Sequence, residues 1–163
     1  MKFVRKMLGM IKVFIFNLKY QNRFKNQEFH YSFVCDNHKG LTFGKRVYIG
    51  PYCHFDAKGE IELQDFCIIA PHVKIWSYNH DFKDEMVPYG KKDIFKKVVV
   101  GKGSWIGLGA TILPGTVIGK GCVIGAGSIV SGVIPDFSMV RPNYSQHEPL
   151  TVSKNENLYR REI

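Results

Sequence analysis

The chain has 163 residues, of which 45% are hydrophobic and 23% are charged. This length and balance fit one globular domain and exclude an intrinsically disordered chain. A formal net charge of +9 often indicates a nucleic-acid or membrane partner. However, residues 1–27 hold seven Lys or Arg and no acid, so the remainder is nearly neutral. We therefore predict no nucleic-acid partner.

The N-terminal segment, residues 1–35, is expected to be basic and helical. Between residues 2 and 20 apolar side chains recur at helical spacing, with cations on the other side. Such a helix binds anionic lipid or caps the end of a repeat, and both alternatives stay open. No apolar run is long enough for a membrane-spanning helix or a signal peptide. The sequence predicts a cytoplasmic protein, with peripheral membrane contact through residues 2–20 as the open alternative.

Glycine is strongly clustered, since ten of the 16 glycines fall between Gly101 and Gly132. From Val100 the chain advances in blocks of six: VGKGSW, IGLGAT, ILPGTV, IGKGCV and IGAGSI. Each block begins with Val or Ile and has a small residue at its fifth position. Residues 43–80 follow the same period less cleanly, with Ile61 and Glu62 inserted. The period fits a short strand plus a corner, repeated as a stack of triangular coils.

We therefore predict an all-β solenoid domain over residues 41–140, followed by a C-terminal tail over residues 141–163. The expected coils, about four in number, span residues 43–60, 63–80, 100–117 and 118–135. Cys53, Cys67 and Cys122 fall at fifth positions, which predicts small buried structural thiols. Their spacing suggests neither a zinc site nor a disulfide framework.

The repeat stops after His80, and residues 81–99 have no register. This predicts a protruding loop, and long loops in compact domains are often functional. His80 stands at its root, where an imidazole could act as a general base near neutral pH. Asn79, at the fifth position of its block, is expected to pack in the coil and to help orient His80.

The hexads, the YNHDF motif after IAPHVKI, and the restart VVVGKGSWIGLGATILPGTVIGKGCVIGAGSIV resemble the hexapeptide-repeat acetyltransferases. The chain is most similar to the galactoside/maltose O-acetyltransferase group and to the O-acetyltransferases of bacterial surface polysaccharide pathways. The resemblance implies a left-handed parallel β-helix, an exception to the usual right-handed crossover. It also implies a homotrimer with active sites between subunits, and acetyl-CoA as co-substrate without a metal.

By the same resemblance, His80 is the catalytic residue. The implied acceptor-binding residues are Asp56, Asn79 and Trp105, and the implied coenzyme A contacts are Leu108, Ala126 and Ser131. Where the family often has a phosphate-binding lysine, this chain has Gly132, and the segment after Val140 also departs from the family. The contacts to the adenine end of coenzyme A are therefore left open, with Lys102, Lys120 and Arg141 as candidates.

The predicted function is transfer of an acetyl group to a sugar hydroxyl, in O-antigen or capsule biosynthesis. One alternative is a streptogramin-type antibiotic acetyltransferase. A second is a carbonic anhydrase-like hexapeptide protein, which needs three histidines around a metal. The spacing of His72 and His80 does not match the close histidine pair of that class. The acceptor itself is not determined by the sequence.

Overall fold

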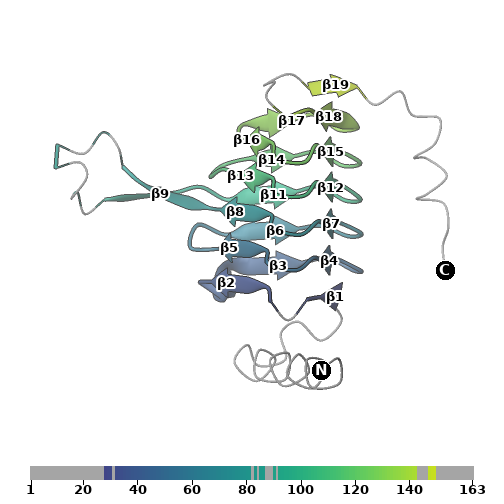
Figure 1. Cartoon of the computed structure of the whole chain (residues 1–163). Coiled ribbons are helices and arrows are strands. Elements are labelled where there is room, and N and C mark those ends of the chain that lie inside the picture. Colours follow the sequence, from purple (N-terminus) through teal and green to yellow (C-terminus); the bar gives the residue numbers. More distant parts are fainter. Residues whose placement is uncertain are drawn as a thin grey trace, which may run out of the picture.

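The computed structural model describes residues 28–142 and 147–149, except residues 31, 82, 84, 87–89 and 91. These residues form an all-β solenoid whose strands stack in three parallel sheets (Figure 1). The predicted helix over residues 2–20 lies outside the described residues. Within the described part of the chain, no helix is long and apolar enough to cross a membrane.

The three sheets form the three sides of the solenoid. Sheet A contains β1 (Glu28–Phe29), β4 (Tyr48–Ile49), β7 (Ile68–Ile69), β12 (Trp105–Ile106), β15 (Val123–Ile124), β18 (Ser138–Val140) and, antiparallel to β18, β19 (His147–Pro149). Sheet B contains β2 (Val34–Asp36), β5 (His54–Asp56), β8 (Lys74–Trp76), β13 (Thr111–Ile112) and β16 (Ile129–Val130). Sheet C contains β3 (Leu41–Phe43), β6 (Ile61–Leu63), β11 (Val98–Val100), β14 (Val117–Ile118) and β17 (Val133–Ile134).

The core follows the six-residue period. First-position side chains of successive coils lie directly above one another, as in the Ile49, Ile69 and Ile106 row of sheet A, and all three are fully buried. Burying each such side chain contributes about 1.5–3 kcal/mol. Fifth positions other than Gly59 and Asn79 are buried as well, and the thiols of Cys53, Cys67 and Cys122 are free and buried. Burial raises the pKa of the Cys53 and Cys67 thiols to about 11.

The predicted parallel β-helix is confirmed, but it has five coils, because one coil precedes residue 43. That coil passes through Phe29, Cys35 and Phe43, so residues 28–35 belong to the solenoid rather than to a helical N-terminal segment. The six-residue period did not reveal this coil, because its edge from sheet B to sheet C is longer than six residues. Phe43 lies eight residues after Cys35, and Leu63 eight after Phe55. The extra residues form the 3-10 turn η1 (His38–Gly40) in the first coil and a turn over residues 57–60 in the second.

Glycine acts in two different ways in the coils. At Gly107, a Cβ would lie 2.5 Å from the carbonyl oxygen of Ile124 in the next coil, so only glycine lets the coils approach this closely. At Gly127, between sheets A and B, φ is +71° and the space around an added Cβ is open. Gly127 therefore provides the positive φ angle that the corner requires, and it leaves the backbone there open to solvent.

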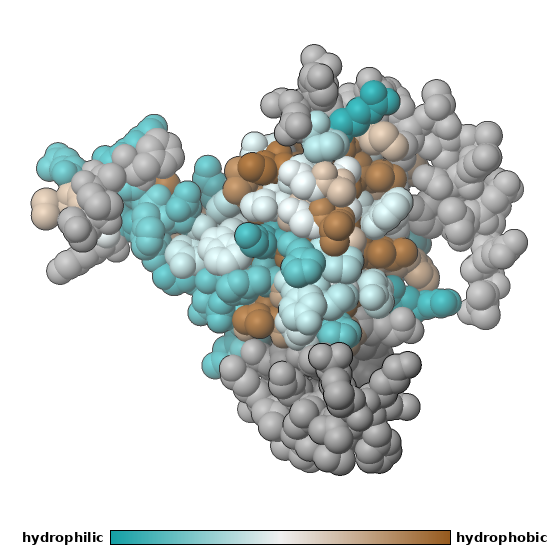
Figure 2. All heavy atoms as spheres, in the orientation of Figure 1, coloured by the Kyte–Doolittle hydropathy of each residue, from teal (hydrophilic) through white to brown (hydrophobic). Residues whose placement is uncertain are grey.

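A β-hairpin interrupts the third coil between sheets B and C. It consists of β9 (Tyr78–His80) and β10 (Asp93–Phe95), which pair antiparallel and project from the stack (Figure 1). The projection begins at Tyr78 and the chain returns to the coil at Val98, so the predicted loop over residues 81–99 started too late and also took in β10 and the first two residues of β11 (Val98–Val100). Figure 2 shows that the hairpin is mostly hydrophilic on the face in view, whereas hydrophobic side chains gather over the coils.

Candidate active site

His80 lies at the base of the hairpin, directly opposite Asp93 in the strand register. Directly opposed residues of an antiparallel pair bring their side chains together. Here the Nδ1 atom of His80 lies 2.9 Å from Oδ1 of Asp93. The imidazole is 73% exposed, whereas the Asp93 side chain is only 19% exposed. The hairpin therefore presents a solvent-accessible imidazole that is held from behind by a carboxylate.

Lys58 contacts the other oxygen of the same carboxylate. Its Nζ lies 2.6 Å from Oδ2 of Asp93. The bond to Lys58, followed by the bond to His80, lowers the pKa of the Asp93 carboxyl, and the bond to Asp93 raises the pKa of the Lys58 ammonium. An ionised carboxylate only accepts hydrogen bonds, so Nδ1 of His80 must carry the proton of that bond. The Nε2 atom then keeps a free lone pair that can accept a proton.

Asp56 and Asn79 lie near this pair but make other contacts. Oδ1 of Asp56 accepts hydrogen bonds from Nδ2 of Asn37 (2.8 Å) and from the Lys58 amide (3.1 Å). Asp56 is buried and so supports the turn that carries Lys58. The prediction that Asn79 packs inside the coil is wrong, because Asn79 is exposed on β9. Its Oδ1 accepts a hydrogen bond from the His80 amide at 2.9 Å.

By register, Val98 takes the interior place that was expected for Asn79, and Ser77, two residues before Asn79, is fully buried as well. Its Oγ accepts a hydrogen bond from the Gly59 amide and donates one to the carbonyl oxygen of Asp56, both at 2.8 Å. The Lys96 amide also donates to the carbonyl oxygen of Ser77, at 2.8 Å. Ser77 thus fastens the base of the hairpin to the turn over residues 57–60.

The remaining sequence-predicted residues lie on other parts of the solenoid. Trp105 is 52% exposed on sheet A, and Leu108 (53% exposed) and Ala126 lie at the corner between sheets A and B. Ser131 is exposed between β16 and β17, at the edge between sheets B and C. A single chain therefore groups His80, Asn79 and Asp56 but does not bring Trp105, Leu108 or Ala126 to them.

The corner that carries Leu108 and Ala126 has room for a ligand against the backbone. Gly109 follows Leu108 and Gly127 follows Ala126, and no atom lies within 4 Å of a Cβ added at either glycine. The Gly127 amide donates to the Leu108 carbonyl oxygen at 2.7 Å, so the two corners stack directly. The result is a ledge on which the backbone is open at the two glycines, beside the exposed Leu108 side chain.

Asp93 and Lys58 are the site residues that sequence reasoning missed. For Asp93 a signal was present, because residues 78–80 and 93–95 stand at the two ends of one loop and both contain strand-forming aromatic residues. For Lys58 no local signal existed. It lies 35 residues before Asp93, and only the stacking of coils brings the two together.

The other histidines in coils have partners of their own. Nε2 of His54 lies 2.7 Å from Oδ2 of Asp36, and its ring meets the Trp76 ring edge-to-face. The His72 ring stacks on that of Tyr52, with centroids 5.1 Å apart. In the part of the chain that the structure describes, no group of three or more His, Cys, Asp or Glu is arranged to hold a metal ion.

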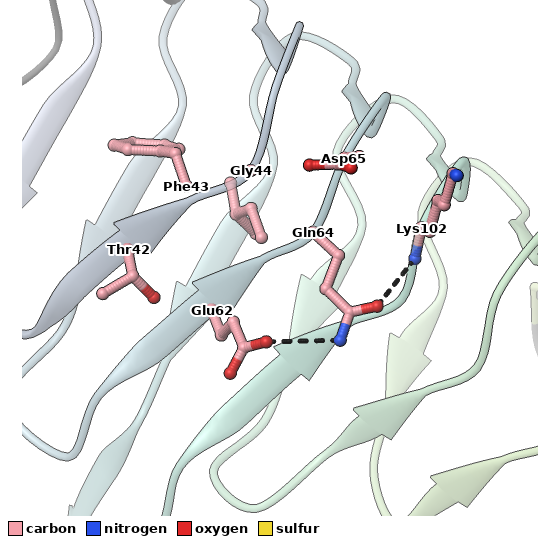
Figure 3. Close-up of a pocket in the computed structure, with 8 residues that line it drawn as sticks. Thr42, Phe43, Gly44, Glu62, Gln64, Asp65 and Lys102 are labelled. Atoms are coloured by element: carbon pink, nitrogen blue, oxygen red, sulfur yellow. Dashed lines mark hydrogen bonds between the residues drawn. The ribbon is translucent and has the colours of Figure 1, made fainter.

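Hollows on the surface of the described residues include one beside Lys58 and one along sheet C. One, of about 670 Å³, adjoins the turn that carries Lys58 and is lined by Asn37, His38, Lys39, Gly40, Ala57, Lys58 and Glu60. The other, of about 360 Å³, lies along sheet C (Figure 3). There the Gln64 amide links the Glu62 carboxylate (3.2 Å) to the Lys102 backbone N–H (3.1 Å). Lys58 lines the first hollow, whereas Asp93 and His80 do not.

Comparison with known proteins agrees with this architecture. Residues 97–132 match the family model described as bacterial transferase hexapeptide (six repeats). Among solved structures, the chain is similar to a maltose O-acetyltransferase from Clostridium difficile 630, with a TM-score of 0.69 and 28% sequence identity. The predicted resemblance to the hexapeptide-repeat acetyltransferases is confirmed. The match covers 77% of this chain and 66% of that enzyme, so the hexapeptide-repeat chain spans just under two thirds of its length.

Two further structures share the hexapeptide fold over almost the whole chain. A hexapeptide-repeat acetyltransferase from Vibrio cholerae has a TM-score of 0.75 and 20% identity, covering 93% of each chain. AntD, an N-acyltransferase from Bacillus cereus crystallised with dTDP-4-amino-4,6-dideoxyglucose and coenzyme A, has a TM-score of 0.67 and 23% identity. That match covers 88% of this chain and 92% of AntD. A comparison with curated protein sequences finds no match.

Proposed function

We propose that the chain is an acetyl-CoA-dependent O-acetyltransferase that acetylates a sugar hydroxyl, with His80 as general base. The observation that carries the proposal is the exposed His80 imidazole bonded through Nδ1 to Asp93 at the base of the hairpin. This arrangement stands in a solenoid shared with acyltransferases, among them the maltose O-acetyltransferase.

The chemistry requires an accessible base and a held donor. Asp93 keeps the proton on Nδ1 of His80, which leaves Nε2 to take the proton of the acceptor hydroxyl as it attacks. Acetyl-CoA supplies an activated acetyl thioester. The ester bond forms as the thioester bond breaks, and His80 returns the proton to the departing thiolate. A base in hydrogen-bond reach contributes about 10²–10⁴-fold in rate.

The donor is proposed to lie on the ledge beside Leu108 and Ala126, where the backbone at Gly109 and Gly127 is bare. Ser131 is a further proposed contact. Lys102 and Lys120 stand at the corner between sheets C and A, over the rings of Phe66 and Phe137. Those two lysines therefore lie at a different corner from the ledge.

We propose that the active form is a homotrimer, with each site built between two subunits. The separation of His80 from Trp105 within one chain supports this, because both are implied by the family resemblance to lie at one site. Sheet A also carries an exposed apolar row in register, Tyr48 (40% exposed), Ile68 (49%) and Trp105 (52%). Contiguous apolar surface of this kind commonly marks a subunit contact. Sedimentation equilibrium should give a mass of three chains, and a monomer at micromolar concentration would refute this part of the proposal.

The acceptor is proposed to be a sugar or glycan, in bacterial surface polysaccharide biosynthesis. The hollow of about 670 Å³ next to Lys58 has the volume of a small-ligand site. The acceptor panel should contain maltose, a β-galactoside, dTDP-4-amino-4,6-dideoxyglucose and a streptogramin antibiotic, with acetyl-CoA as donor. Acetylation of a sugar supports the proposal, and acetylation of the antibiotic alone would replace it with the streptogramin-type alternative.

The role of His80 is tested with His80→Ala, assayed on whichever acceptor the wild type uses fastest. We expect a folded protein whose kcat/KM is at least about a hundredfold lower, since a general base has been removed. His54→Ala is the matched control, because His54 also bonds an aspartate but lies on sheet B. Equal losses in the two variants, or near-normal turnover of His80→Ala, would refute the assignment.

Peripheral contact with the inner face of the cell membrane, through residues 2–20, is a separate proposal that rests on the basic sequence of this segment. Flotation with anionic liposomes should carry the full chain upward and leave a variant lacking residues 2–20 at the bottom. Equal flotation of the two proteins would contradict membrane contact through residues 2–20. It would favour the alternative that this segment caps the end of the solenoid.

A further inference from the structure

The corner between sheets A and B places equivalent residues of four successive coils in one column. Tyr52, His72, Gly109 and Gly127 all have positive φ angles, between +59° and +71°. Each of the last three donates its amide hydrogen to a carbonyl oxygen of the preceding coil, at 2.7–3.0 Å. The column therefore advances by one place per coil, about 4.8 Å, which is the spacing of neighbouring strands.

The first two places of this column hold aromatic rings and the next two hold none. The rings of Tyr52 and His72 stack with centroids 5.1 Å apart and planes 17° apart, so they follow the spacing of the coils. At Gly109, no atom of the described residues lies within 4 Å of an added Cβ. The place where a third ring would continue the stack, on the face of His72 away from Tyr52, is therefore open.

The fold itself does not require rings at this corner. Glycine holds the same position in the fourth and fifth coils, and a left-handed backbone is unfavourable for residues that carry a side chain. Both Tyr52 (59% exposed) and His72 are exposed, so burial does not offset this cost. Backbone strain of this kind is concentrated at ligand sites.

Polar groups stand beside the open place, on the outer face of sheet B. Lys74 follows His72 by two residues and Thr111 follows Gly109 by two, and the strand register pairs Lys74 with Thr111. Lys74 is exposed and Thr111 is half-buried. A sugar ring presents C–H groups on its face and hydroxyl groups at its edge. The electron-rich face of an aromatic ring attracts the first, and an ammonium and a hydroxyl can bond the second.

The proposed course of the donor indicates which ligand this ring belongs to. The residues proposed to contact coenzyme A, Leu108, Ala126 and Ser131, succeed one another away from His72 along the chain and up the coils. A ring stacked on His72 therefore lies at the lower end of the ledge and belongs to the acceptor, with the donor arm approaching from the side of Leu108 and Ala126.

We propose that the stacked pair of Tyr52 and His72 is the platform on which the pyranose ring of the acceptor lies, with Lys74 and Thr111 bonding its hydroxyl groups. This inference rests on the proposed function and names the acceptor subsite within it. In the proposed homotrimer, a neighbouring subunit brings the base of its hairpin, with His80, to this corner.

The first test measures sugar binding without acetyl-CoA, by isothermal titration calorimetry with maltose and with methyl β-galactoside. His72→Asn and Tyr52→Asn remove the rings, and asparagine adopts the left-handed backbone readily. Kd for the sugar should rise about five- to tenfold in His72→Asn and less in Tyr52→Asn. His72→Tyr keeps an aromatic face and should stay within about twofold of the wild type. If His72→Asn does not fold, His72→Gly replaces it, because glycine holds this position in the next coil.

Phe66→Asn is the matched control. Phe66 is also exposed (41%) and has a φ angle of +61°, but it lies at the corner between sheets C and A. Its substitution should leave sugar binding unchanged. An equal loss in Phe66→Asn, or a wild type that binds neither sugar, overturns the inference. So does a loss of coenzyme A affinity in His72→Asn with sugar binding unchanged, which would place the adenine ring on the platform instead.

The second test measures acetyl transfer from acetyl-CoA to the panel sugar that the wild type uses fastest. In His72→Asn the KM for the sugar should rise by the same factor as Kd, whereas kcat and the KM for acetyl-CoA should change less than about twofold. If sugar binding responds as expected but no protein, the wild type included, transfers acetyl groups, the proposed function fails and the sugar platform stands. If transfer is normal and the KM for the sugar does not respond to His72→Asn, the inference fails alone.

Discussion

Two buried serines offer a direct test of what holds the hairpin in place. Ser77 and Ser128 are both almost completely buried, and each can be changed to Ala with the same loss of one hydroxyl. Oγ of Ser77 makes two hydrogen bonds of 2.8 Å, to the Gly59 amide and the Asp56 carbonyl oxygen. Oγ of Ser128 has no hydrogen-bond partner among the described residues. The two substitutions should therefore differ sharply.

The expected magnitude follows from the groups left behind. Ser77→Ala leaves the Gly59 amide without its partner, whereas the Asp56 carbonyl oxygen keeps the hydrogen bond from the Ser77 amide at 3.1 Å. A buried donor left unpaired costs about 1–3 kcal/mol. We expect the free energy of unfolding to fall by about 1–3 kcal/mol. Ser128→Ala removes a hydroxyl that is itself unpaired, so its stability should change by less than about 0.5 kcal/mol or rise slightly.

The assay is urea unfolding followed by circular dichroism, with all variants at one protein concentration because oligomer stability depends on concentration. Unchanged m-values would show that the comparison reports stability rather than a change in compactness. A loss below about 0.5 kcal/mol in Ser77→Ala, or an equal loss in Ser128→Ala, would refute the reasoning that hydrogen bonding by Ser77 fastens the hairpin.

Two further outcomes are expected from the coils. The pKa values of Cys53 and Cys67 are raised from 9.0 to about 11 in the folded chain, so the stability they contribute is complete below pH 9 and is lost as pH rises toward 11. Urea unfolding at pH 10 should therefore give a stability about 2–3 kcal/mol lower than at pH 8. The double variant Cys53→Ala/Cys67→Ala should show a much smaller fall, and an equal fall would contradict this assignment. Gly107→Ala should destabilise the fold by about 1–3 kcal/mol or more, since its Cβ would meet the backbone of the next coil at 2.5 Å. Gly127→Ala should cost only about 1 kcal/mol, the strain of a left-handed corner with open space around it; thermal melts that reverse this order would be inconsistent with the coil packing.

Much of the solenoid could be predicted from the sequence because the repeat is local. From Val100 to Val130 every sixth residue is a Val or Ile whose side chain is buried inside the solenoid. Each coil therefore repeats the environment of its neighbour. Where the edge between sheets B and C grew to eight residues, at Cys35 to Phe43, the period was lost and the first coil was missed. Asn79 was misplaced for a different reason, because the chain leaves the coil at Tyr78 to form the hairpin.

The sequence by itself determined the coil register, the buried thiols and the position of His80 at the edge of an interruption. Those features depend on spacing along the chain, which is visible in one dimension. Only the tertiary structure decided what surrounds His80. Asp93, 13 residues after His80 in the sequence, reaches it across the hairpin, and Lys58 reaches Asp93 from 35 residues away by the stacking of one coil on another. Such contacts depend on loop closure and coil stacking, and for Lys58 no local pattern of residues indicates the contact.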